Sequence, residues 1–178
     1  DLLKNDVKEF KGSSEKYKLI NKTSVLKEFI NNCYKKSVIS IDCETNSLDA
    51  KSASLVGISM SYSEGKACYI PLRHGHELDN DQPDFILDNQ APFSQIPFLE
   101  VINLIKPILE DNSILKIGHN IKYDSLVMKQ NQNGNINLQP IGDTMCISYV
   151  VDPGRVDNHK LDSLALRELK HETIKYED

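Results

Sequence analysis

The sequence predicts an α/β fold, a mixed β-sheet flanked by helices, and two observations carry this prediction. Three strand-like runs follow one another between residues 37 and 72, with only short turn-rich pieces between them. From residue 96 the apolar residues change to helical spacing, and one short strand-like run interrupts the later helical segments. Strands and helices in this order are typical of a single layered domain.

The composition is that of one domain with a full core. A chain of 178 residues with 39% hydrophobic content is long enough to bury one. The formal net charge of -5 gives no general attraction to nucleic acid, although metal ions can neutralise acidic groups gathered at one site. The four cysteines are widely spaced and match no zinc pattern, so we expect free thiols in a reducing compartment.

Neither a membrane span nor a secretion signal is expected. No apolar run approaches the roughly 18 residues that a bilayer requires, and the polar start does not resemble a signal peptide. We therefore predict no membrane association and a cytoplasmic location.

The chain is expected to begin with a lead-in and a helix. Residues 1–22 are polar, mixed in charge and contain the sequence KGSSEK, which predicts a linker or an extended lead-in. From Thr23 onward the apolar residues recur at helical spacing, which predicts an amphipathic helix that ends at Lys35 and Lys36. We expect the folded domain to cover residues 23–178.

Three predicted strands follow this helix. They are SVISIDC at residues 37–43, SLVGISMSY at 54–62 and KACYIPL at 66–72. Short connections between consecutive strands favour antiparallel pairing. Residues 74–95 are polar and interrupted by prolines, which predicts a long surface loop or insertion.

The second half of the chain is predicted to be mostly helical. The sequence IPFLEVINLIKPILED at residues 96–111 predicts a helix with Pro107 near its end, and SILKIG at 113–118 predicts a short strand. Further helices are predicted over residues 119–130, 142–152 and 161–171. The apolar residues of the last of these are expected to form a core face. Asp143 is either another site carboxylate or a cap of the helix that follows it.

Two carboxylates end the first predicted strand. Side chains alternate across a strand, so Asp42 and Glu44 point to the same side, where two like charges repel unless a cation lies between them. Asn120 and Asp124 are four residues apart in a predicted helix and would therefore share one face. The alternatives remain that the strand emerges into solvent and that Asp124 complements the helix dipole.

These residue types suit a site for hard divalent cations. Mg²⁺ prefers a few carboxylate ligands and leaves positions for water and for substrate phosphate. Two such ions roughly 3.5–4 Å apart can stabilise the attacking and the leaving oxygen of a phosphodiester displacement. An Asp-x-Glu on a strand with one more Asp from a helix is a reasonable ligand set for such a pair.

Several stretches together resemble the 3′–5′ exonuclease domain of bacterial DNA polymerase I, a family A polymerase. They are IDCETNSLDAKSASLVGISMSYSEGKACYIPL, LKIGHNIKYD, DTMCISYVV and HKLDSLALRELKHETIKYED, in the same order as in that family. The resemblance implies a ribonuclease H-like fold of the DEDD superfamily. It also implies two divalent metal ions, Mg²⁺ or Mn²⁺, held by Asp42, Glu44 and Asp124. In that family the first Asp bridges both ions, and the Asp of the second motif acts largely through water.

The resemblance also implies how the 3′ end of single-stranded DNA is held. Leu48 matches a leucine that wedges against the terminal base, Asn120 a residue near the terminal nucleotide, and Tyr176 an aromatic residue beside it. The alternatives are that Leu48 belongs to the core, that Asn120 caps a helix, and that Tyr176 is an ordinary surface residue. The implied partner is a polymerase domain in the same, longer protein, and the implied role is proofreading.

One motif of that family is missing. None of the seven tyrosines has an Asp four residues later, and none of the five histidines does either. We therefore expect the domain to be incomplete at its C-terminal end and this chain to be deficient in catalysis. Two other functions stay open, an RNA-processing DEDD exonuclease and a non-catalytic spacer domain of a family A polymerase.

Overall fold

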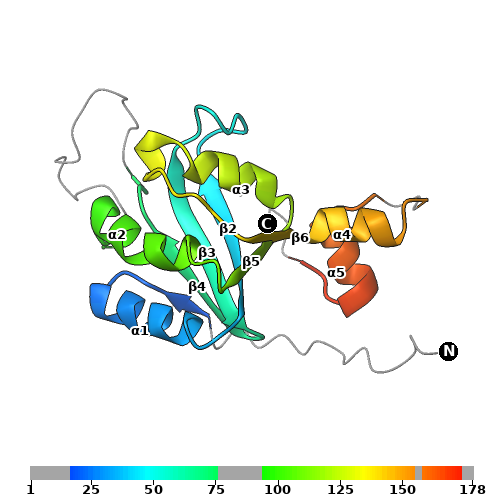
Figure 1. The fold of residues 1–178 in the computed structure, drawn as a ribbon, viewed down its shortest axis with the longest axis horizontal. Helices are drawn as coiled ribbons and strands as arrows, with labels where there is room; N and C mark the ends of the chain where they lie inside the picture. The colour runs from blue at the N-terminus through cyan, green and yellow to red at the C-terminus, as the bar shows by residue number, and fades with distance from the viewer. Residues whose placement is uncertain (1–16, 76–93, 155–157, 174–178) are drawn as a thin grey trace.

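The structure is a computed structural model that describes residues 17–75, 94–154 and 158–173 (Figure 1). Its centre is a six-stranded sheet with the strand order β1-β4-β3-β2-β5-β6. The strands are β1 (Lys18–Leu19), β2 (Val38–Thr45), β3 (Leu55–Ser63), β4 (Lys66–Pro71), β5 (Leu115–Gly118) and β6 (Ile141–Asp143). The helices are α1 (Thr23–Cys33), α2 (Phe98–Leu109), α3 (Ile121–Met128), α4 (Thr144–Val151) and α5 (Leu161–Leu169), with a 3₁₀ turn η2 (Asn131–Asn133) after α3.

The sheet is mixed, as the sequence predicts. β2, β3 and β4 pair antiparallel as a meander, because their connections are short. β5 pairs with β2 in parallel, and β6 pairs with β5 in parallel. Helices lie along the sheet between these strands, so the α/β fold with a mixed sheet and flanking helices is confirmed.

The two faces of the sheet differ in chemistry. Ile41 of β2 stands opposite Met60 of β3, and both are buried in the hydrophobic core. The alternate residues along each strand point to the other face, where Asp42 of β2 stands opposite Ser59 of β3. α1 and α2 lie side by side (Figure 1) and bury their apolar stripes in the same core as Ile41. The strand that carries the acidic pair is thus anchored by its apolar side.

The start and the edges of the sheet differ from the prediction. Residues 17–22 belong to the predicted lead-in, yet Lys18–Leu19 forms β1, which pairs with β4. Ile20 directly after it is fully buried, so this end of the lead-in packs onto the domain. Residues 1–16 and most of the predicted loop at 74–95 lie outside the described residues. The strand β6 was not predicted, because three residues are too few to show a period.

The last two helices exist but do not form the expected core face. Only Ala165 of α5 is buried, and no residue of α4 is. Figure 1 shows α4 and α5 together beyond the β6 edge of the sheet. The prediction of a core face is therefore wrong for α5, whose leucines Leu161, Leu166 and Leu169 are exposed. In the described part of the chain, no helix is both long and apolar enough to span a bilayer.

Candidate active site

The end of β2 presents two carboxylates on one side of the sheet. Asp42 and Glu44 are exposed, and Cys43 between them is half-buried, in agreement with the alternation of side chains along a strand. Glu44 stands opposite Gly57 of β3, which has no side chain to screen it. The two carboxylates therefore share the polar face.

Asp124 joins them from α3. Its side chain is only 3% exposed, and its Oδ1 accepts a hydrogen bond of 2.8 Å from the backbone N–H of Cys43. Cys43 is the residue between Asp42 and Glu44, so this bond fixes the helix carboxylate at the end of the strand. The structure thus places Asp124 beside the strand end that carries Asp42 and Glu44.

Asp42 interacts electrostatically with each of the other two carboxyl groups. Desolvation is the main cause that raises the pKa of Asp124 to about 6, and the nearby charge of Asp42 is the second. Hydrogen bonds from Cys43 act in the opposite direction. The side chain of Glu44 is exposed, but partial desolvation at the strand end and then the charge of Asp42 raise its pKa. Burial also raises the pKa of Asp42, although a hydrogen bond from the Cys43 backbone and the charge of His119 act in the opposite direction. A bound cation would reverse these shifts.

The donor set fits a hard divalent cation. No ion pair within the described ranges involves Asp42, Glu44 or Asp124, so their charges are not balanced by a lysine or an arginine there. The same residues do not include three His, Cys, Asp or Glu side chains already arranged as a metal site. The carboxylates are electrostatic neighbours that a metal would have to draw together.

Leu48 and Asn120 each lie four positions along the chain from a carboxylate of the cluster, Glu44 and Asp124 respectively. Leu48 is 97% exposed in the loop after β2, so it is not a core residue. Asn120 precedes α3 with a left-handed backbone (φ 59°), and its side chain makes no capping hydrogen bond. Asn120 is not helical, so the prediction that it shares a helical face with Asp124 is wrong. Tyr176 lies outside the described residues.

Asp143 acts as the predicted cap. Its Oδ1 accepts hydrogen bonds from the backbone N–H groups of Met145 (2.9 Å) and Cys146 (3.4 Å) at the start of α4. The same oxygen accepts a bond of 3.0 Å from the N–H of Asn120. Asp143 therefore also holds the turn before α3 in place.

Two side chains that interact electrostatically with the cluster, His119 with Asp42 and Tyr69 with Glu44, carry no sequence signal. Thr144 Oγ1 donates to the carbonyl of Gly118, so it must accept the 3.0 Å hydrogen bond from Nδ1 of His119. Nε2 of His119 is buried and, among the described residues, has no hydrogen-bond partner. Tyr69 lies over Gly57, where a Cβ would overlap its ring, and its hydroxyl hydrogen-bonds Nε2 of His74 at 2.7 Å. Contacts of this kind depend on strand pairing and cannot be predicted from spacing.

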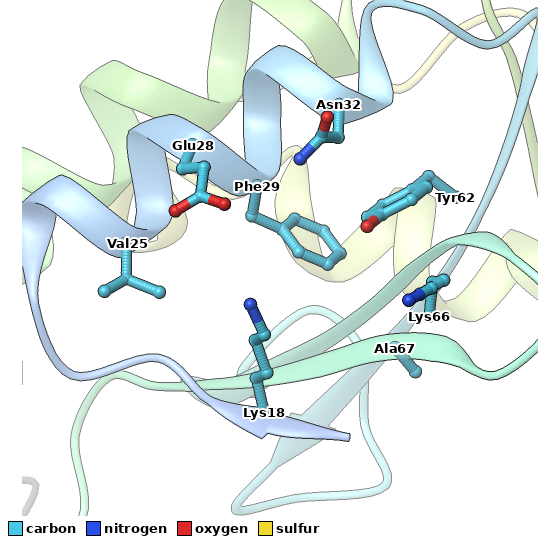
Figure 2. Close-up of a pocket in the computed structure, with 8 residues that line it drawn as sticks. All are labelled: Lys18, Val25, Glu28, Phe29, Asn32, Tyr62, Lys66 and Ala67. Carbon is cyan, nitrogen blue, oxygen red and sulfur yellow. The ribbon is translucent and has the colours of Figure 1, made fainter. Parts of the chain in front are cut away.

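A separate pocket of about 200 Å³ lies at the other end of the sheet (Figure 2). Figure 2 shows Phe29 of α1 at its centre, with Lys18 and Lys66 beside it. Tyr62, which also lines it, follows Ser61, the partner of Ser40 near the start of β2. None of the three carboxylates lines this pocket, so it is distinct from the candidate site.

The fold and the acidic strand end define a ribonuclease H-like nuclease domain, and comparison with known proteins specifies the family. The family model described as 3′–5′ exonuclease matches residues 17–178. The chain belongs to this family, and it is a DEDD-type exonuclease domain of the DNA polymerase I kind.

Curated relatives support this placement. DNA polymerase I of Pseudomonas aeruginosa is 40% identical over 79% of this chain and 14% of its own length. DNA polymerase I of Rhizobium leguminosarum is 33% identical over 91% of this chain and 16% of its own length. The chain therefore spans only about one sixth of these relatives.

Solved structures share the fold. Escherichia coli RNase D, an exoribonuclease involved in structured RNA processing, has a TM-score of 0.62 at 20% identity and covers 90% of this chain and 35% of its own. Brucella melitensis NrnC with bound Mg²⁺ has a TM-score of 0.60 at 23% identity, over 92% of this chain and 65% of its own. The expected ribonuclease H-like fold is confirmed.

Proposed function

We propose that this domain edits DNA within a DNA polymerase I, and that Asp42, Glu44 and Asp124 hold two divalent ions, Mg²⁺ or Mn²⁺, at a single-stranded 3′ end. The observation that carries the proposal is the bond from Cys43 to Asp124, which joins carboxylates from two elements at one strand end. The relatives are longer DNA polymerases, so the proposed partner is a polymerase domain of the same protein, acting in replication and repair in the cytoplasm.

The chain's own residues hold the reacting groups. When bound, a metal pair of this kind activates a water and stabilises the oxygens of the displaced phosphodiester. Burial first and the charge of Asp42 second raise the pKa of both Glu44 and Asp124, so Asp42 lies close enough to both to help them hold the ions. Asp124 has one oxygen committed to the Cys43 backbone, which fits a role exerted partly through water.

Leu48 and Asn120 are the proposed contacts to the terminal nucleotide. The side chain of Leu48 is almost fully exposed, and that of Asn120 is not used for capping, so both are available to a ligand. Tyr176 remains a proposed third contact. A sequence-tolerant hold of this kind suits an enzyme that removes any terminal base.

RNA processing is the second candidate, favoured only by the fold that this chain shares with RNase D. The relatives with higher sequence identity are DNA polymerases, so DNA is the proposed substrate. A spacer domain without metal binding is the third reading. Each of these functions predicts a different binding result.

Metal binding tests the proposal directly. The 178 residues contain no Tyr-x-x-x-Asp motif, so binding is a safer readout than turnover. We expect calorimetry to show that the wild-type chain binds Mn²⁺. In Glu44→Gln the affinity for Mn²⁺ should fall by at least about tenfold. Glu64→Gln, the same change in the exposed β3–β4 turn, is the matched control and should bind normally.

Nucleic acid binding then separates the substrates. With Mn²⁺ present, a 5′-labelled DNA oligonucleotide should bind more tightly than RNA of the same sequence. A preference for RNA would support the RNA-processing function instead. Absence of Mn²⁺ binding to the wild-type chain would overturn the metal site and favour the spacer.

A further inference from the structure

The loop after β2, residues 46–53, holds an exposed apolar side chain on an ordered backbone. A single exposed leucine such as Leu48 is ordinary and indicates nothing by itself. The backbone around it, however, is tied down on both sides. Asn46 Oδ1 accepts a bond of 2.8 Å from the N–H of Ser54, and Ser47 Oγ accepts one of 3.1 Å from the N–H of Asp49. The loop therefore has a defined shape.

A tyrosine of α3 hydrogen-bonds the backbone of this loop one residue before Leu48. The hydroxyl of Tyr123 donates to the carbonyl of Ser47 at 2.5 Å, and Thr45 Oγ1 donates to the same carbonyl at 3.0 Å. The two hydroxyl oxygens are 2.6 Å apart and hydrogen-bond each other, so their two hydrogens serve three contacts. Both side chains thus converge on one backbone oxygen, and Tyr123 reaches it from 76 positions away in the sequence.

Two consecutive residues of α3 therefore hydrogen-bond the end of β2 and the loop that follows it. Asp124 binds the backbone of Cys43, and its neighbour Tyr123 binds that of Ser47. One rigid helical turn fixes both a carboxylate of the candidate site and the backbone that carries Leu48. The distance between them is set by this helix and not by the loop alone.

From this geometry we propose that Tyr123 is a positioning residue. Its hydroxyl holds Leu48 at a fixed place relative to Asp124, so that the leucine packs on the terminal nucleotide while the adjoining phosphate lies at the carboxylates. The inference rests on the proposed function and deepens it. Tyr123 itself touches neither the metal ions nor the reacting atoms.

Tyr123→Phe tests this role because it removes only the hydroxyl. Tyr62→Phe is the matched control, since Tyr62 is also half-buried but lines the pocket at the other end of the sheet. The probes are Mn²⁺ alone and a 5′-labelled oligothymidylate with a hydrolysis-resistant 3′-terminal linkage. We expect Tyr123→Phe to bind Mn²⁺ within about twofold of wild type and the oligonucleotide about tenfold more weakly. Amide hydrogen exchange at residues 47–49 should become faster, and Tyr62→Phe should change none of these.

A double-mutant cycle separates positioning from a general structural role. If Tyr123 acts through Leu48, Tyr123→Phe should weaken oligonucleotide binding by less than about twofold in a Leu48→Ala background. An equal loss in both backgrounds, or a parallel loss of Mn²⁺ affinity, would overturn the inference.

Binding by the wild-type chain separates a failure of the positioning role from a failure of the proposed function. If it binds the oligonucleotide and Tyr123→Phe binds just as tightly, only the positioning role is overturned. If the wild-type chain binds no oligonucleotide, the proposed function fails and the inference fails with it. In that case the hydrogen-exchange result still shows whether Tyr123 holds the loop.

Discussion

At the scale of single residues, Asp124 combines burial with charge. Its carboxyl is 3% exposed and close to Asp42, and desolvation with this charge raises its pKa to about 6. A carboxylate in such a place costs folding free energy when it is ionised. Residues placed for ligand binding often carry this kind of cost, because the ligand and not the fold compensates for it.

We predict that Asp124→Asn stabilises the metal-free protein at pH 7 by about 1–3 kcal/mol and abolishes Mn²⁺ binding. Asn is isosteric and can still accept the bond from Cys43, but it carries no charge. Urea unfolding of both proteins in EDTA measures the difference in unfolding free energy. A less stable variant would show that the ionised carboxylate contributes favourably.

The pH dependence of stability follows from the same shift. The folded pKa of about 6 lies above 3.8, the ordinary pKa of an aspartic acid side chain, so between these values the folded protein binds more protons than the unfolded chain. The contribution of Asp124 to stability is therefore most favourable below about pH 4, falls as the pH rises toward 6 and stays low above it. The difference in stability between Asp124→Asn and wild type should accordingly shrink from pH 7 to pH 4.

At the scale of elements, the polar face of the sheet is built by close packing across β2, β3 and β4. Gly57 of β3 lies between Glu44 and Pro71 in the strand register, and the ring of Tyr69 covers it. A methyl group at this position would overlap the ring and its hydroxyl. The glycine therefore allows Tyr69 to reach the site and to bond His74.

We predict that Gly57→Ala destabilises the domain by about 1–3 kcal/mol, the usual cost of overpacking. Most of this cost should disappear when Tyr69→Ala is introduced as well, because the overlapping ring is then gone. Chemical unfolding of the two single variants and the double variant measures the coupling. Additive losses would mean that strain in β3 itself, and not the contact with Tyr69, is responsible.

Elements with a clear period were predictable, and those made by pairing were not. β2 and α2 each show a strong apolar pattern, and the structure places both close to the predicted bounds. β1 and β6 have two and three residues, so they exist only because β4 and β5 offer them a neighbouring edge. Alternation along β2 predicted the shared side of the acidic pair. The hydrogen bond from Tyr123 to Ser47 was not predictable, because hydrogen-bond partners far apart in sequence leave no periodic signal.

At the scale of the whole molecule, α4 and α5 give the described surface an apolar region. The residues concerned include Ile147, Tyr149, Val150 and Val151 of α4 and the exposed leucines of α5. Val150 and Val151 are 79% and 77% exposed. Sequence patterns predicted these helices correctly but could not tell an apolar stripe in the core from one at the surface.

We predict that the double substitution Val150→Ser and Val151→Ser lowers the binding of a hydrophobic dye while changing the unfolding free energy by less than about 0.5 kcal/mol. Val101→Ser, at a fully buried position of α2, is the contrasting variant and should destabilise the domain clearly. Dye fluorescence and urea unfolding provide the two readouts. A large loss of stability in the double variant would show that α4 is packed in solution.

The hydrogen bond between Cys43 and Asp124 also bears on the order of folding. It joins residues 81 positions apart, whereas the β2–β3–β4 meander needs only contacts between neighbouring strands. Contacts of low sequence separation tend to form early, because closing a long loop costs more entropy. On the ribosome, the meander can form before α3 has emerged, but its two carboxylates then lack their third member. The candidate site is therefore assembled only when α3 joins the meander, and an N-terminal fragment that ends before α3 lacks its third carboxylate.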